Sequence, residues 1–253
     1  MRPVGETGAG KWGRSLFPQE VRAPVKATRG KKAPSPFPLG GCSLSGKLVL
    51  IVGGARSGKS RFAQRLAQSA PQPVGYVATA LACDAEMRER IARHRADRPS
   101  EWLTHEFPEG ALEDPSIESP LGALIRSAAG TCATLIADCL TIYLARRLAP
   151  FYHDDLIPRG DQEAAEALVR ADLAAMVAAQ RESGASLIIV SNELGWGVVP
   201  PYASGRLLRD ISGTANQTIS AQADHAYFVM AGAPLDLHAL QAAGSPYGEA
   251  PRA

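Results

Sequence analysis

The segment GGARSGKS at residues 53–60 has the residue types and the spacing of a phosphate-binding loop. It fits the pattern G-x-x-x-x-G-K-[ST], which ends on Gly58, Lys59 and Ser60. The glycines let backbone N–H groups approach phosphate oxygens, the lysine can reach the β- and γ-phosphates, and the serine hydroxyl can bind Mg²⁺. An apolar run precedes the segment and a helical pattern follows it, as this chemistry requires. The sequence therefore predicts a site for a nucleoside triphosphate with Mg²⁺.

Asp138 ends the apolar run TLIAD and is a candidate partner for that site. Phosphate loops usually have an acidic residue at the end of a neighbouring strand, where a carboxylate holds the metal or its waters. The alternative is that Asp138 is the N-cap of the helix expected after it, because aspartate is a favoured cap. The guanine-reading pattern N-K-x-D is absent from the sequence, which argues against a signalling GTPase.

His94 lies among arginines in ERIARHRADRP, residues 89–99. In a helix, Arg90 and Arg98 would lie one turn to either side of His94 on the same face. The arginines could then clamp the non-reacting oxygens of a polyphosphate while the imidazole attacks phosphorus or acts as a general base. The alternative is a solvated helix face on which glutamates pair with Arg90 and Arg93. The residues alone leave both interpretations open.

Short apolar runs and amphipathic stretches alternate along the chain, and these elements must position the groups above. The runs predict strands at 48–52, 74–78, 134–138, 186–191 and 226–230. The stretches between them predict helices at 60–70, 84–96, 139–148, 161–183 and 204–224. With the phosphate loop, this alternation indicates an α/β, P-loop NTPase-like fold whose mostly parallel sheet is flanked by helices, in a single domain at 47–232. Residues 108–130 carry no clear pattern.

The two ends of the chain lack such patterns. Residues 1–46 are basic and rich in Gly and Pro, with no period that could bury a face, and predict a disordered extension. A transit peptide and a nucleic-acid-binding arm are its functional alternatives. Residues 233–253 fade into Gly, Pro and Ala and predict a flexible tail.

Composition excludes several classes of protein. A hydrophobic content of 45% in 253 residues is ample for a core, and a formal charge of +2 gives no reason to expect nucleic acid as a partner. The 4 cysteines form no C-x-x-C pair and no zinc-like spacing, which indicates reduced thiols. No apolar run approaches the roughly 18 residues of a membrane span. We therefore expect a cytoplasmic protein without a membrane span.

Four stretches, taken in order, resemble the bifunctional adenosylcobinamide kinase and adenosylcobinamide-phosphate guanylyltransferase family of cobalamin biosynthesis. They are GGARSGKSRFA (53–63), DAEMRERIARHRADRPSEWLTHE (84–106), SNELGWGVVP (191–200) and GRLLRDISGTANQTISAQAD (205–224). The resemblance covers roughly residues 47–232, and it is specific because a generic phosphate-loop protein would share only the first stretch.

This resemblance implies a single P-loop domain, often assembled as a homotrimer, that carries out two reactions on one corrinoid. ATP or GTP would first phosphorylate adenosylcobinamide, with Lys59 at the γ-phosphate. GTP would then donate GMP to the product through a guanylylated histidine, and His94 falls at that position, three residues before DRP. The two reactions need attack at different phosphorus atoms, so the helix that carries His94 would have to move.

The resemblance also implies which residues hold the nucleotide. Those at the phosphates would be Gly54, Ala55, Arg56, Ser57, Gly58, Lys59, Ser60 and Arg61, with Ser60 as the ligand of Mg²⁺. Those lining the nucleotide would be Thr79, Ala80 and Leu81, and those contacting the guanylyl donor would be Arg95, Ala96, Asp97, Arg98 and Glu106. Asp138 matches an acidic position of the family, where its side chain would act directly or through a water.

The stretch SNELGWGVVP follows a predicted strand, and its glycines suit a loop that approaches a ligand closely. We expect it to shape the corrinoid side of the site. The alternative is a glycine-rich turn in which Trp196 simply packs.

Two other functions stay open at this point. One is a single activity, either a small-molecule kinase in which His94 only binds phosphate or a transferase without the kinase step. The other is a nucleotide-dependent assembly module whose basic N-terminal arm recruits a partner.

Overall fold

The computed structural model describes residues 44–80, 85–152 and 157–241, without the side chains of Glu86 and Arg90. All of these residues belong to one compact unit, Cys42–Ala253. The predicted disordered extension lies outside the described residues except at 44–46. There Leu44 is buried, and its carbonyl accepts a hydrogen bond from the Ser186 hydroxyl at 2.5 Å, so this short stretch is part of the domain.

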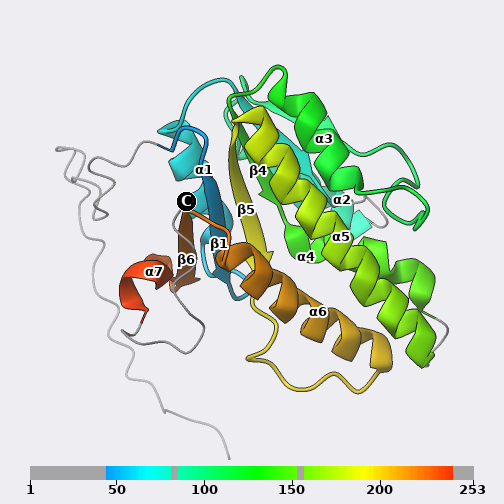
Figure 1. Cartoon of the computed structure of the whole chain (residues 1–253). Helices are drawn as coiled ribbons and strands as arrows, with labels where there is room; N and C mark the ends of the chain where they lie inside the picture. The colour runs from blue at the N-terminus through cyan, green and yellow to red at the C-terminus, as the bar shows by residue number, and fades with distance from the viewer. Residues whose placement is uncertain (1–43, 81–84, 153–156, 242–253) are drawn as a thin grey trace, which may run out of the picture. The chain divides into compact units, whose positions relative to one another are not determined.

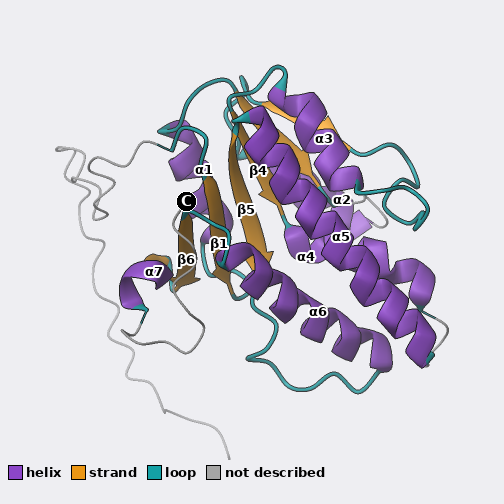
Figure 2. Ribbon diagram, in the orientation of Figure 1, coloured by secondary structure: helices purple, strands orange, loops and turns teal. Residues whose placement is uncertain are grey.

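One sheet of seven strands runs through the described residues in the order β3-β2-β4-β5-β1-β6-β7 (Figures 1 and 2). The strands are β1 (Leu48–Gly53), β2 (Val74–Ala78), β3 (Leu103–Glu106), β4 (Thr134–Asp138), β5 (Ser186–Asn192), β6 (His225–Met230) and β7 (Ala233–Asp236). All neighbours are parallel except β7, which is antiparallel to β6. The carboxyl ends of six strands therefore meet at one edge of the sheet, where a ligand site is expected.

Helices cover both faces of the sheet. They are α1 (Lys59–Gln68), α2 (Ala85–Ala96), α3 (Pro120–Ala129), α4 (Leu140–Leu148), the short 3-10 helix η1 (Ala149–Phe151), α5 (Arg159–Ser183), α6 (Ala203–Ser220) and α7 (Leu237–Leu240). Leu48 and Leu50 of β1 point to the face covered by α3, α4, α5 and α6, whereas Val49 and Ile51 point to α1. Alternate side chains of β1 thus enter two cores, as expected for a central parallel strand. In Figure 1, α3, α5 and α6 lie on the near side of the sheet.

The five predicted strands and the five predicted helices are confirmed, with ends that shift by a few residues. β3 and α3 are among the elements that were not predicted. The side chains of β3 are mostly exposed at the edge of the sheet, so they lack the alternation that marks a half-buried strand. α3 occupies part of the 108–130 stretch that carried no clear pattern.

Residues 233–241, expected as the start of a flexible tail, form β7 and α7. β7 pairs with β6, with Leu235 opposite Phe228, and the Asp236 carboxylate caps α7 by accepting from the Ala239 N–H at 3.0 Å. Pairing with β6 orders this segment, although its amino-acid composition does not predict order. The remainder of the predicted tail lies outside the described residues.

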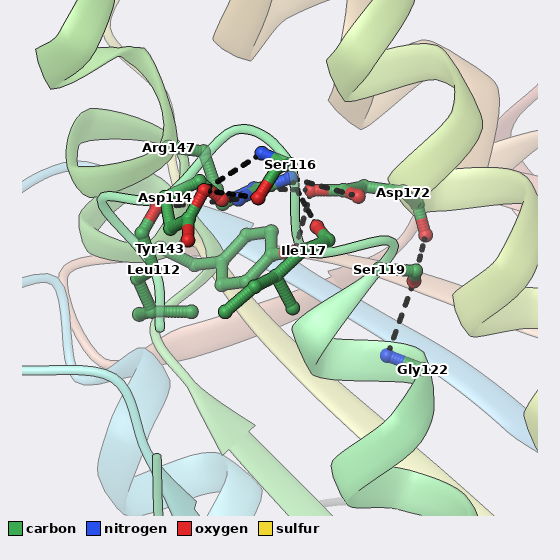
Figure 3. Close-up of polar contacts among 9 residues, drawn as sticks. All are labelled: Leu112, Asp114, Ser116, Ile117, Ser119, Gly122, Tyr143, Arg147 and Asp172. Atoms are coloured by element: carbon green, nitrogen blue, oxygen red, sulfur yellow. Dashed lines mark hydrogen bonds and ion pairs between the residues drawn. The ribbon is translucent and has the colours of Figure 1, made fainter. Parts of the chain in front are cut away.

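The buried guanidinium of Arg147 on α4 holds the segment between β3 and α3 in place through hydrogen bonds (Figure 3). Arg147 pairs with the equally buried Asp172 of α5 at 2.7 Å. It also donates to the carbonyls of Leu112, Asp114 and Ile117 at 3.4, 2.7 and 3.1 Å. A buried charge is tolerated when it is paired and its N–H groups are satisfied, as here. The cluster fixes the segment whose first residues line the cavity described below.

None of the helices within residues 44–80, 85–152 and 157–241 is both long enough and apolar enough to cross a membrane.

Candidate active site

The phosphate loop is a tight turn between the end of β1 and the start of α1. Arg56 and Gly58 have positive φ angles of 56° and 98°, and the Ser57 N–H donates to the Gly54 carbonyl at 3.2 Å. The turn leads directly into α1, which has no acidic residue in its first turn. The N–H groups of the first helical turn and the helix dipole therefore favour an anion at this point.

Two glycines of the loop are required by close backbone approach. A Cβ on Gly53 would lie 2.5 Å from the Val229 carbonyl oxygen, and one on Gly58 would lie 3.2 Å from the Gly232 Cα. The Gly232 N–H also donates to the Ser57 carbonyl at 2.8 Å. The turn after β6 thus packs against the loop and fixes its shape.

Lys59 and Ser60 lie at the first turn of α1 and face a cavity of about 490 Å³. The Lys59 side chain is almost buried, and its ammonium donates to the Gly54 carbonyl at 3.2 Å. The same cavity is lined by His94, Arg95 and Arg98. It is also lined by Tyr76, Ala78, Ala80, Met87, Ile91, Glu106, Phe107, Pro108, Glu109, Asp138, Cys139, Ile142, Arg146 and Asn192. The structure therefore brings the predicted kinase lysine and the predicted nucleophile to one cavity.

The two interpretations of the histidine helix apply to different residues of α2, and the side chain of Arg90, which both used, lies outside the described part of the chain. His94 is half-buried and lines the cavity, whereas the neighbouring Arg93 is exposed and pairs with Glu89 at 2.9 Å. Arg98 lies beyond the end of the helix at Ala96 and reaches the same cavity. His94 thus faces the cavity, whereas Arg93 belongs to a solvated face.

Arg98 is held over the ring of Tyr76, 3.2 Å from its centroid. Its Nε and Nη1 atoms are buried and have no hydrogen-bond partner in the described part of the chain. Burial lowers the pKa of Arg98, and burial together with the charge of Asp138 raises the pKa of Tyr76 well above its ordinary value. The neutral phenol donates to the Asp138 carboxylate at 3.1 Å. Unpaired guanidinium donors beside a cavity are suited to phosphate oxygens.

Asp138 is not the cap of α4, because the N-cap of that helix is Cys139. Its carboxylate lines the cavity together with the Ser60 hydroxyl. Among the described residues no group of three or more His, Cys, Asp and Glu could hold a metal alone. Two protein oxygens fit Mg²⁺, which usually keeps several waters and takes further oxygens from substrate phosphates.

The other predicted site residues differ in where they lie. Arg95 and Glu106 form an ion pair with each other at the cavity wall. Thr79 is fully buried and joins the ends of β2 and β4, because its hydroxyl accepts from the Cys139 N–H at 2.8 Å. Ala96 and Asp97 are exposed and are not among the residues that line the cavity. Leu81 lies outside the described residues, and Ala55 and Arg61 are exposed on the loop and on α1.

Tyr76, Cys139 and Arg146 are among the cavity residues that were not predicted. Tyr76 lies within a strand, where the sequence indicates a core residue. Burial raises the pKa of Cys139 to about 11, so its thiol stays neutral and unreactive. Arg146 donates to the Glu113 carboxylate at 2.6 and 3.2 Å and to the Thr79 carbonyl at 3.1 Å. Its place beside Arg147 on an amphipathic helix is a weak signal, since paired arginines usually indicate a solvated helix end.

Comparison with known proteins shows the family of this chain. The family model described as cobinamide kinase / cobinamide phosphate guanyltransferase matches residues 49–237, and so includes β7. The bifunctional adenosylcobalamin biosynthesis protein CobP of Pseudomonas aeruginosa is 39% identical over 188 residues, which are 74% of this chain and 95% of that protein. Its counterpart CobU of Escherichia coli is 33% identical over 185 residues, 73% of this chain and 96% of that protein.

Among solved structures the likeness is weak. The flagellar accessory protein FlaH of Methanocaldococcus jannaschii aligns with a TM-score of 0.40 and 16% identity over 77% of each chain, and it adds nothing to the assignment. The family match and the curated relatives confirm the resemblance that the four sequence stretches indicated. The chain belongs to the cobinamide kinase / cobinamide phosphate guanyltransferase family.

Proposed function

We propose that this protein phosphorylates adenosylcobinamide with ATP or GTP and then transfers GMP from GTP to adenosylcobinamide phosphate through a guanylylated His94. The products of the second reaction are adenosylcobinamide-GDP and pyrophosphate. The observation that carries the proposal is that Lys59 and His94 line the same cavity. Membership of a family with both activities supports it.

In the kinase reaction the terminal hydroxyl oxygen of the corrinoid forms a bond to the γ-phosphorus. The bond from that phosphorus to the β–γ bridging oxygen breaks, the nucleoside diphosphate leaves, and the hydroxyl proton is lost to solvent. Lys59 neutralises charge on the phosphate oxygens, and Ser60 and Asp138 are the side chains that would hold Mg²⁺. When bound, Mg²⁺ would neutralise further charge on the same oxygens.

In the transfer reaction a ring nitrogen of His94 forms a bond to the α-phosphorus and pyrophosphate leaves. An oxygen of the corrinoid phosphate then attacks the same phosphorus, and the P–N bond breaks to restore the imidazole. Arg98 would bind the non-reacting oxygens, since its Nε and Nη1 are buried beside the cavity and have no partner among the described residues. The nucleophiles of the two reactions attack different phosphorus atoms, so α2 or the triphosphate must shift between them.

Labelled GTP without corrinoid tests the histidine step. With Mg²⁺ and label at the α-phosphorus, the protein should become labelled, and the label should be acid-labile and base-stable as in a phosphoramidate. Label at the γ-phosphorus should not be retained. His94→Ala should abolish labelling, whereas Arg93→Ala, on the exposed face of α2, should retain it.

Transfer of γ-label to adenosylcobinamide tests the kinase step, and Lys59→Ala should abolish it. Kinase activity that survives in a protein never labelled at His94 would instead establish the single-activity kinase, in which the histidine only binds phosphate.

We also propose a homotrimer and a cytoplasmic location, both supported by the family resemblance. Sedimentation of the purified protein measures the first, and fractionation of cells measures the second.

A further inference from the structure

The loop between β5 and α6, residues 193–202, exposes large apolar side chains. Trp196 is 74% exposed, Val198 95% and Tyr202 54%. The Trp196 ring touches Phe228 of β6 at a centroid distance of 5.0 Å, which orients the indole but leaves most of it uncovered. The alternative interpretation, a turn in which Trp196 simply packs, is therefore wrong. Several large apolar side chains exposed in one short segment are typical of a binding surface.

A polar hollow of about 400 Å³ lies at the base of this loop. Glu193 and Gly195 of the loop line it together with Arg209, Asp210, Thr214 and Gln217 of α6. Two carboxylates against one guanidinium disfavour a phosphate group, and the mixture of donors and acceptors suits neutral amides, which need both. The hollow therefore differs from the phosphate site in the charges that line it, and we expect it to bind a different ligand.

The loop starts beside the phosphate turn. The Glu193 N–H donates to the Gly53 carbonyl at 3.1 Å, and the preceding Asn192 lines the nucleotide cavity. Asn216 of α6 donates from Nδ2 to the Asn192 carbonyl at 3.1 Å, which ties the helix of the hollow to the wall of the cavity. A ligand that lies on the loop can thus extend an arm towards the γ-phosphate.

We propose that this loop and its hollow form the docking site of the corrinoid acceptor. The inference rests on the proposed function. The flat, apolar macrocycle covers Trp196 and Val198, its peripheral amides enter the hollow at Gln217, and the arm with the reacting hydroxyl passes Asn192 to the phosphates. His94 and the residues of the phosphate loop line the nucleotide cavity without belonging to this loop or its hollow, so the nucleotide step does not need this surface.

Equilibrium dialysis of adenosylcobinamide against the full-length protein, without nucleotide, tests the docking site. Trp196→Ala should weaken binding about tenfold, as expected for one well-placed aromatic contact, and Trp196→Phe should restore most of it. Gln217→Ala, in the hollow, should weaken it several-fold. Leu240→Ala, which removes an apolar side chain with 65% exposure from α7, should bind as the wild type does.

Two parallel measurements separate this inference from the proposed function. Labelling by α-labelled GTP should be unchanged in Trp196→Ala, because that step involves no corrinoid. Equal corrinoid binding by wild type and Trp196→Ala would overturn the docking site, and so would a lower sedimenting mass of the variant, since the loop would then be a contact between copies. A wild type that binds the corrinoid through Trp196 yet transfers neither phosphate nor GMP would uphold the docking site and refute the function.

Discussion

At the scale of single residues, Gly58 has a conformation that other residues adopt only at a cost. Its φ of 98° lies in the left-handed region, and a Cβ would come within 3.2 Å of the Gly232 Cα. Gly58→Ala should therefore destabilise the domain by about 1–3 kcal/mol and distort the turn that faces the phosphates. Urea denaturation and γ-phosphate transfer measure the two effects. Gly160→Ala is the matched control, since nothing lies within 4 Å of its added Cβ in α5, and unaltered stability of Gly58→Ala would contradict the assignment.

Lys59 and His94, which we propose as catalytic residues, could be singled out in the sequence because a loop pattern marks the first and a family motif marks the second, and both line the cavity. Tyr76 and Arg146 could not, because what makes them site residues is a partner far away in the chain. Tyr76 reaches Asp138 across 62 positions, and Arg146 reaches Thr79 across 67. No local period carries that information.

At the scale of elements, the ion pair between Arg146 and Glu113 connects α4 to the segment before α3. The contribution of this pair to stability should depend on pH. Hydrogen bonds from Arg146 hold the pKa of Glu113 below its ordinary value. The unfolded chain, with a glutamate pKa of about 4.3, binds the proton first as pH falls. The stability that Glu113 contributes is therefore complete above that pH and is lost as pH falls through the folded pKa.

Glu113→Gln should accordingly be less stable than wild type at pH 7, and the difference should shrink as the pH is lowered below about 4. Urea denaturation at both pH values measures this difference. In the Arg146→Met background the same substitution should have little effect at either pH. A difference between wild type and Glu113→Gln that stayed constant with pH would show that the pair does not stabilise the folded state.

The second connection between these elements is the buried cluster of polar contacts around Arg147. Arg147→Met keeps most of the volume but removes the guanidinium from three carbonyls and from the Asp172 carboxylate, which keeps the Tyr143 hydroxyl as a donor, and this should cost about 3–5 kcal/mol. Adding Asp172→Leu should recover only part, because the carbonyls of Leu112, Asp114 and Ile117 remain unsatisfied. Arg126→Met, which breaks an exposed pair with Glu182, should change stability little. Full recovery in the double variant would mean that the carbonyl contacts contribute nothing.

Strands with both faces buried were predictable from the sequence, and edge strands that depend on pairing with a neighbour were not. β1, β4 and β5 are continuous apolar runs because both faces of a central parallel strand are covered. β3 and β7 lie at the two edges of the sheet and have few buried side chains, so their residues show no strand pattern. The segment from 107 to 119 is irregular in sequence because its order comes from Arg147 on a distant helix.

At the scale of the whole domain, the cavity draws its walls from β2, β4, β5, α1, α2 and α4, so a nucleotide bound there should stabilise all of them together. Mg²⁺–GTP at 100 times its Kd should raise the free energy of unfolding by about 2.7 kcal/mol, in a single transition. Arg98→Ala removes two buried donors that have no partner in the described residues, and binding at least tenfold weaker would reduce the gain at the same GTP concentration to about 1.4 kcal/mol or less. Arg93→Ala, five positions earlier and paired with Glu89 on the exposed face, should keep the full gain. Urea denaturation with and without Mg²⁺–GTP measures all three proteins, and an undiminished gain in Arg98→Ala would place the nucleotide away from the cavity that joins His94 to the phosphate loop.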